Sequence, residues 1–176
     1  MKQLTKLKFY IIHSAEKRTK LLIKNKLFKH VGDNFFFQSR IIPDEPELIS
    51  FGNNVAVASG VTFVTHDVID KVLNNIDKDF NYNYNCAPIE VGNNVFIGCN
   101  VTILPNIKIG NNVIIAAGSI VTKDVPDNTI IAGNPAKKIG SFTDYIEKRK
   151  KINDTLLYPS DEASIKYIWD KFNNEK

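Results

Sequence analysis

The sequence predicts a mainly β fold in which short strands stack as a solenoid between helical ends. The first observation is a six-residue period of aliphatic residues between positions 89 and 122. One column contains Val91, Ile97, Ile103, Ile109, Ile115 and Val121, and a second contains Ile89, Val95, Val101, Ile107 and Val113. This period fits neither an α-helix nor simple strand alternation, so it indicates short strands joined by tight corners around one aliphatic core.

The second observation is the recurrence of Gly-Asn-Asn at residues 92–94 and 110–112, with a further glycine at Gly98. Glycine and asparagine adopt a backbone of positive φ at the lowest cost, and the corners of a solenoid need sharp bends. We therefore expect both residue types at the bends because of their tolerance of positive φ.

The third observation concerns the two ends of the chain. Between Leu4 and Phe28 the apolar residues fall mostly three or four apart, which predicts one or two amphipathic helices. We expect segment 1–30 to cap the first coil, because an open end would leave strand edges and apolar core uncovered. Segment 141–176 is predicted as a helical extension. Its first helix has Ser141 or Thr143 as N-cap, and a second helix follows Pro159.

The repeats between residues 31 and 140 are interrupted twice. Residues 41–47 contain two prolines, which cannot donate strand hydrogen bonds, so an irregular excursion is expected there. The six-residue register returns at residues 49–63, and residues 67–88 then break it altogether. Their asparagines and tyrosines predict an external loop, and long loops in compact domains are commonly functional.

Composition and charge limit the function classes. The 176 residues, 43% of them hydrophobic, suffice for one folded unit. No apolar run approaches the roughly 20 residues that span a bilayer, and no signal peptide is recognisable, so we expect a cytoplasmic protein without stable membrane insertion. Cys86 and Cys99 are expected as reduced thiols. Residues 1–30 hold nine basic residues against Glu16 alone. We interpret these as a solvated helix face, since no nucleic-acid-binding motif accompanies them.

The repeat, together with residues 116–126 (AAGSIVTKDVP) and 132–137 (AGNPAK), resembles the hexapeptide-repeat O-acetyltransferases. The nearest group is that of the maltose, galactoside and capsular-polysaccharide acetyltransferases, with xenobiotic acetyltransferases as neighbours. The resemblance implies a left-handed parallel β-helix over about residues 31–140 and acetyl-CoA as acyl donor. It further implies a homotrimer with active sites between subunits, to which the loop 67–88 contributes as a projecting arm.

His66 is the predicted catalytic base. In the resembling enzymes the base is a histidine at the end of a hexapeptide coil, just before the protruding loop, and His66 occupies that position. An imidazole that titrates near neutrality can remove the proton from a hydroxyl group as it attacks a thioester. His13 and His30 belong to the N-terminal helical segment and are expected to be surface or core-edge residues.

The predicted acceptor site combines the early coil with the loop. Adjacent residues on an extended chain point to opposite faces, so we do not expect Asp67 to contact His66. Glu45 or Asp44 is expected to orient His66 instead. The related sugar acetyltransferases place an asparagine and an acid in the early coil; this chain has Gln38 and Glu45 near those places and thus departs from asparagine. Gln38 either binds a sugar hydroxyl or is an ordinary exposed strand residue. The predicted substrate-binding residues are Gln38, Glu45, Asp67, Tyr82 and Tyr84.

The resemblance also implies where coenzyme A binds. The pantetheine arm is expected along successive coils where small side chains allow close backbone approach, with lysines near the phosphates and Pro135 near the adenine. The predicted cofactor residues are Gly98, Cys99, Ala117, Gly118, Thr122, Lys123, Pro135, Lys137 and Lys138. The structural alternative is a set of corner glycines with a solvated rim of lysines. Cys99 is expected to line the groove, since direct transfer needs no acyl-enzyme.

These features predict an acetyl-CoA-dependent O-acetyltransferase that acts, without a metal, on a sugar or sugar-containing precursor, as in capsule or O-antigen synthesis. Chloramphenicol-type xenobiotics, serine and amino-sugars stay open as alternative acceptors. A non-catalytic β-helix that binds or scaffolds is a remoter alternative. Zinc-dependent hydration on this fold needs about three histidine ligands, and only His66 is suitably placed.

Overall fold

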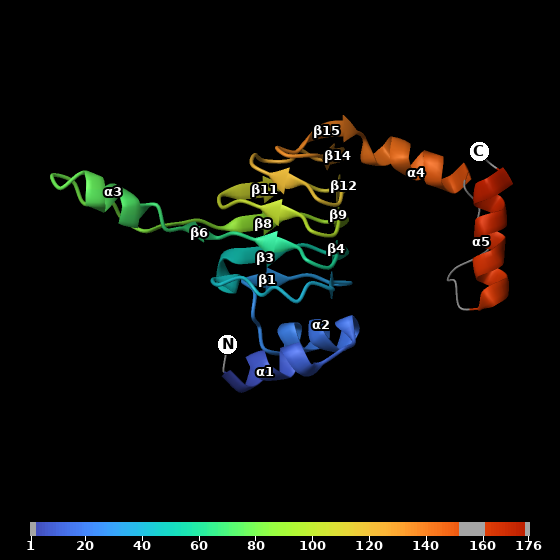
Figure 1. Cartoon of the computed structure of the whole chain (residues 1–176), viewed down its shortest axis with the longest axis horizontal. Coiled ribbons are helices and arrows are strands. Elements are labelled where there is room, and N and C mark those ends of the chain that lie inside the picture. The colour runs from blue at the N-terminus through green and yellow to red at the C-terminus, as the bar shows by residue number, and fades with distance from the viewer. Residues whose placement is uncertain (1–2, 152–160, 175–176) are drawn as a thin grey trace. The chain divides into compact units, whose positions relative to one another are not determined.

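The computed structural model describes residues 3–151 and 161–174. The chain divides into two units, Met1–Thr143 and Asp144–Lys176. The first unit contains a stack of β-strands, two helices below it and an arm that projects from its side (Figure 1). The second contains a long C-terminal helix and most of the helix that precedes it.

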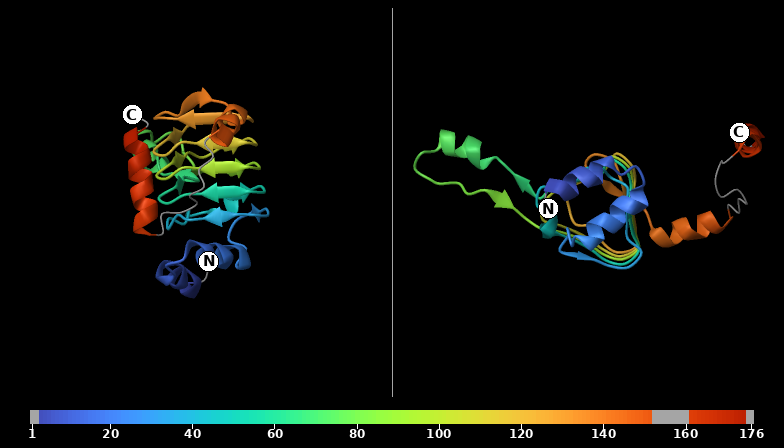
Figure 2. Two further views of the ribbon diagram at one scale, coloured as in Figure 1. Left: turned by 90° about the vertical axis from the view of Figure 1, so that its right-hand side faces the viewer. Right: turned by 90° about the horizontal axis from the view of Figure 1, so that it is seen from below.

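Parallel strands form three sheets around the axis of the stack (Figure 2). The first sheet has the order β1 (His30–Val31), β3 (Ile49–Phe51), β8 (Ile89–Val91) and β11 (Ile107–Ile109). The second has the order β2 (Phe36–Phe37), β4 (Val55–Val57), β9 (Val95–Ile97), β12 (Val113–Ile115) and β14 (Thr129–Ala132), with β15 (Lys137–Gly140) antiparallel at its end. The third has the order β5 (Thr62–Phe63), β10 (Thr102–Ile103) and β13 (Ile120–Val121).

The pairing register explains the six-residue period. Ile89 pairs with Ile107 and Val95 with Val113, so partners stand eighteen positions apart and each turn of the chain gives one six-residue unit to each sheet. Every member of both predicted aliphatic columns is at most 4% exposed. Burial of these side chains in one continuous cluster is the main source of stability in such a stack. The prediction of a mainly β chain of stacked strands with helices at both ends is confirmed.

The corners correct one part of the sequence interpretation. Asparagines carry the positive φ, as at Asn94 and Asn112 (both 56°), whereas Gly92 and Gly110 do not adopt it. Gly92 is needed because of close stacking: a Cβ atom there would lie 2.7 Å from the carbonyl oxygen of Gly110 in the next turn. The asparagines also pair between turns, since the Asn94 Nδ2 donates to Asn112 Oδ1 over 2.9 Å.

Two helices lie below the first turn: α1 (Gln3–Ile11) and α2 (Ala15–Lys24) (Figure 1). Phe9 and Leu22 are buried in the same cluster as the first-turn side chain Phe37. The Phe37 N–H donates to Thr19 Oγ1 over 2.9 Å, which joins α2 to β2. The helices thus cover apolar side chains at this end of the stack. The three-segment division at residues 30 and 140 stays a prediction.

The regular stacking of strands is interrupted twice in the structure. Between β2 and β3 the chain leaves the strand pattern and ends in the short 3-10 helix η1 (Pro46–Leu48). Between β5 and β8 it forms the arm, which contains β6 (His66–Asp67), α3 (Asp70–Ile76) and β7 (Asn85–Cys86). Thr62 pairs with Thr102, forty positions on, which is one turn of eighteen plus twenty-two inserted residues. The arm is therefore inserted without loss of register above it.

The C-terminal helices are α4 (Phe142–Lys151) and α5 (Glu162–Asn174). Helix α4 begins directly after Ser141, one of the two predicted N-cap positions. The predicted apolar side of α5 is 45–60% exposed at Ile165, Ile168, Trp169 and Phe172. Pro159 lies outside the described residues. No helix within 3–151 or 161–174 is long and apolar enough to cross a membrane.

Gly92→Ala is expected to lower the free energy of unfolding by about 1–3 kcal/mol, because the new Cβ meets the backbone of the next turn. Chemical denaturation at a fixed protein concentration measures this. Glu90→Ala is the matched control, since Glu90 is exposed and its ion pair with Lys108 is solvated, so its effect should stay within about 0.5 kcal/mol. Equal stability of the Gly92→Ala protein and the wild type would contradict the close-stacking explanation.

Candidate active site

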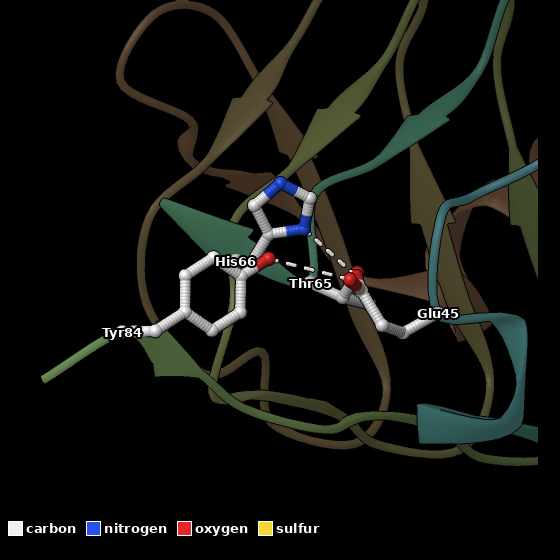
Figure 3. Close-up of polar contacts among 4 residues, drawn as sticks. All are labelled: Glu45, Thr65, His66 and Tyr84. Atoms are coloured by element: carbon white, nitrogen blue, oxygen red, sulfur yellow. Dashed lines mark hydrogen bonds and ion pairs between the residues drawn. The ribbon is translucent and has the colours of Figure 1, made fainter. Parts of the chain in front are cut away.

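His66 and Glu45 meet where the two interruptions of the repeat come together (Figure 3). His66 begins β6 at the base of the arm, and Glu45 directly precedes η1 in the excursion between β2 and β3. The Nδ1 atom of His66 lies 2.8 Å from Glu45 Oε2. Of the two carboxylates that the sequence left open, Glu45 is thus the one that contacts His66.

Two further side chains hold Glu45. Thr65 is a buried residue, only 2% exposed, and its hydroxyl donates to Glu45 Oε2 over 2.5 Å. The Tyr84 hydroxyl donates to Oε1 over 3.3 Å. The rings of Tyr84 and His66 also face each other, with centroids 5.2 Å apart (Figure 3). Both carboxylate oxygens are therefore bonded, which restrains the rotamer of Glu45 and fixes its position against the imidazole.

The hydrogen bonds determine the electrostatics of the pair. The Thr65 hydroxyl, followed by His66, holds the pKa of Glu45 below its ordinary value. Partial burial and the nearby Glu45 carboxylate raise the pKa of Tyr84, so that the phenol keeps its proton as a donor. An ionised Glu45 beside Nδ1 favours the tautomer with the proton on that nitrogen and leaves Nε2 as an acceptor.

A general base needs an unprotonated nitrogen that can accept a proton, and Nε2 is such an atom in this tautomer. His66 is partly exposed, with 25% of its side chain accessible. It also lines a pocket of about 180 Å³ together with residues 41–44 and 62–65. The arrangement can therefore take a proton from a hydroxyl group that enters beside His66. Within the described parts of the chain, no cluster of His, Cys, Asp or Glu side chains is placed to hold a metal ion.

The other predicted acceptor residues lie in different places. Asp67 accepts from the Ile69 N–H and from Asn85 Nδ2, and both bonds brace the base of the arm. Tyr82 donates its hydroxyl to Asp77 Oδ2 within the arm. Gln38 lines a separate pocket below the second turn. A role in acceptor binding stays a prediction for all three.

The predicted cofactor residues fall at two corners of the coil. Gly98, Cys99, Ala117 and Gly118 stack at the corner that leads into the third sheet, where the Gly118 N–H donates to the Cys99 carbonyl over 2.8 Å. Pro135 is near this corner, because the following Ala136 N–H donates to the Ile120 carbonyl over 2.8 Å. Thr122 and Lys123 follow β13 at the opposite end of the same sheet, and Lys137 and Lys138 are exposed on β15. Their assignment to coenzyme A stays a prediction.

Sequence reasoning missed Thr65. The alternation of Val61, Phe63 and Thr65 places all three on the buried side of the chain, and Thr65 is the polar member. A polar residue at a buried position is expected to have a hydrogen-bond partner. The interruption of an apolar alternation next to His66 was therefore the available signal.

Thr65→Val is expected to raise the pKa of Glu45 toward its ordinary value, because it removes the largest of the stabilising hydrogen bonds to the carboxylate. Folding lowers this pKa, so the ionised group stabilises the protein above its unfolded pKa, and that stabilisation is lost as the pH falls through the folded pKa. Carbon-detected NMR titration of the Glu45 carboxyl group measures the shift. Thr65→Ser keeps the hydroxyl and serves as control; an unchanged pKa in Thr65→Val would refute the assignment.

Known proteins that are similar to this chain in sequence or in structure point to one family. The model of bacterial hexapeptide transferases (six repeats) matches residues 88–123. Protein CapG of Staphylococcus aureus is 49% identical over 159 residues, which are 86% of this chain and 88% of CapG. The crystal structure of a maltose O-acetyltransferase from Clostridium difficile 630 is 32% identical, with a TM-score of 0.61, over 79% of this chain and 83% of that one. Galactoside acetyltransferase in complex with coenzyme A is 27% identical, with a TM-score of 0.60, over 82% and 80%. The chain therefore belongs to the hexapeptide-repeat acetyltransferase family.

Proposed function

We propose that this acetyltransferase moves an acetyl group from acetyl-CoA to a hydroxyl group of a sugar or a sugar-containing precursor, with His66 as the general base. The observation that carries the proposal is the contact between His66 Nδ1 and a carboxylate that is itself bonded at both oxygens. This contact gives His66 a defined tautomer and orientation, which a surface histidine without a role does not need.

In the proposed reaction the acceptor hydroxyl lies against Nε2 of His66. As its oxygen attacks the thioester carbonyl, its proton passes to Nε2, and Glu45 stabilises the imidazolium that forms. Backbone N–H groups near the site stabilise the oxyanion of the tetrahedral intermediate. Collapse of that intermediate breaks the carbon–sulfur bond, and the departing thiolate of coenzyme A takes the proton from His66. The ester and free coenzyme A leave, and His66 returns to its starting state.

The positions of the two corners support an active site shared between subunits. Within one chain, Cys99 lies just before β10 and His66 just after β5, at opposite ends of neighbouring parallel strands. A second subunit whose Cys99 corner packs against His66 completes the site. Three subunits related by a threefold axis form such contacts in a closed ring. We propose this homotrimer, together with the left-handed winding of the coil that the family resemblance implies.

The class of acceptor rests on the relatives. The maltose and galactoside acetyltransferases are named for sugar acceptors. Surface-polysaccharide synthesis is a setting in which an O-acetylated sugar is made, and we propose it as the role of this chain. Serine and chloramphenicol are the acceptors that the assay below must compare with sugars.

His66→Ala is expected to lower kcat/KM at least about a hundredfold, because it removes general-base assistance. Release of free thiol from acetyl-CoA, measured over a panel of sugars, serine and chloramphenicol, gives this ratio and the acceptor class together. His30→Ala is the control, since His30 is an exposed residue of β1 outside the site. Equal rates for His66→Ala and the wild type would remove His66 as the base, and turnover confined to serine or chloramphenicol would remove the sugar assignment.

A further inference from the structure

A second pocket, of about 290 Å³, lies between the helical end and the second turn of the coil. Its polar lining comes from segments far apart in sequence: His13 between the two helices, Arg18 on α2, Gln38 and Arg40 after β2, and Ser59 after β4. No carboxylate is among the lining residues. The pocket therefore carries an uncompensated positive charge.

Arg18 is an unusual group to find in this place. The residue is only 3% exposed, and its Nε atom is buried without a hydrogen-bond partner. Its NH1 atom donates to the carbonyls of Ile12 and His13, and NH2 donates to the carbonyl of Gln38 over 2.8 Å. These acceptors are neutral, and the guanidinium carbon also lies 5.7 Å from the centre of the Phe9 ring. Within residues 3–151 and 161–174 no carboxylate forms an ion pair with Arg18. Burying a charge without an opposite charge is costly.

Arg40 adds a second positive charge to the same pocket. Its guanidinium group donates to the carbonyls of Tyr10 (2.9 Å) and Ile12 (3.3 Å), again without a carboxylate partner among the described residues. Burial, followed by the like charge of Arg40, lowers the pKa of Arg18. Arg40 is exposed and holds spare N–H donors. An anion between the two guanidinium groups would relieve this repulsion.

The start of α2 also faces the pocket, and Glu16 in its first turn, which lines a different pocket, offsets only part of its positive field. Ser14 is the N-cap of this ten-residue helix, so the helix begins beside His13 and Arg18, two of the lining residues. The N-terminus of a helix carries partial positive charge and attracts anions. The guanidinium of Arg18 is almost completely buried, has no anionic partner among the described residues and keeps one unbonded donor at Nε. This is the independent observation that makes the helix end part of a candidate site.

The pocket adjoins the proposed chemistry. Ile41 lines both this pocket and the pocket that contains His66. Ser59 belongs to the corner column of Cys99, because the Asn100 N–H donates to the Ser59 carbonyl over 2.9 Å. An acceptor that reaches His66 along residues 38–44 would pass this positive pocket.

We propose that this pocket binds an anionic group on the acceptor, so that the enzyme prefers sugars carrying a carboxylate or a phosphate. The proposal rests on the proposed function for its role in catalysis. Arg40 contacts the anion with its spare N–H groups, while Arg18 supplies fixed charge and holds the Gln38 backbone in place. A planar carboxylate and a tetrahedral phosphate each present a pair of oxygens to which a guanidinium group can donate two hydrogen bonds. Either group can therefore fill the pocket.

Glucose, glucuronate and glucose 1-phosphate test the proposal as a series on one sugar ring: a neutral member, a member with a carboxylate at C6 and a member with a phosphate at C1. Calorimetric titration of the full chain with each compound at low ionic strength measures binding directly. The wild type should bind one or both anions and bind glucose at least about tenfold more weakly. Arg40→Gln should reduce anion affinity by about tenfold or more. Ser59→Asp, a change at an exposed position, should do the same by adding a negative charge.

Lys24→Gln is the matched control, since Lys24 is an exposed cation of α2 that does not line the pocket. It should bind the anions as the wild type does. Failure of both anions to bind, or equal loss in Lys24→Gln and Arg40→Gln, overturns the proposal. Binding of glucuronate but not of glucose 1-phosphate would support an acidic sugar as the acceptor. Binding of glucose 1-phosphate but not of glucuronate would support a phosphorylated sugar.

The thiol-release assay separates this proposal from the proposed function. If the enzyme turns over sugars, the ratio of kcat/KM for the anionic over the neutral member should fall at least about tenfold in Arg40→Gln. An unchanged ratio contradicts a role in acceptor choice even though the catalytic assignment stands. If no sugar is turned over but anions still bind in an Arg40-dependent way, the proposed function fails and the anion site remains.

Discussion

The structure depends on one constraint: each side of the coil must deliver an apolar side chain to the same place in every turn. Residues 89–121 meet it through eighteen-residue turns, and their inward side chains are almost completely buried. Close stacking then forbids a Cβ atom at Gly92, and asparagines such as Asn94 take the bends. A coil built this way tolerates inserted residues only at its corners, where they can leave the stack and return in register.

The residues of the candidate site lie in the two segments that do not follow the eighteen-residue turns. The excursion before η1 carries Glu45, and the arm carries His66 at its base and Tyr84 on its return. The excursion leads into β3 and the arm leaves from β5, and pairing within two different sheets holds these strands in place. The regular part of the chain thus supplies rigidity, and the irregular part supplies the carboxylate and the imidazole. Pre-organised groups of this kind lose little entropy when a substrate binds.

Much of the fold could be predicted because a six-residue period leaves few alternatives. The inward columns, the excursion and the arm all follow from where the period holds and where it fails. The reason for Gly92 could not be predicted, since spacing in sequence does not reveal how closely two turns approach. The site was only partly accessible: His66 follows from its place before the arm, but the choice of Glu45 over Asp44 depends on the path of an excursion without periodicity. Arg18 shares helix α2 with three lysines, and in the sequence nothing separates it from them; its burial does.

The central claim is that Glu45 acts through His66. A double-mutant cycle of Glu45→Gln and His66→Ala, followed by thiol release from acetyl-CoA, tests it most directly. The account predicts that Glu45→Gln lowers kcat/KM in the presence of His66 and has little further effect in its absence. The coupling free energy should be about 0.5–3 kcal/mol. Equal losses from Glu45→Gln in both backgrounds would show that the two residues act independently and would contradict the claim that Glu45 acts through His66.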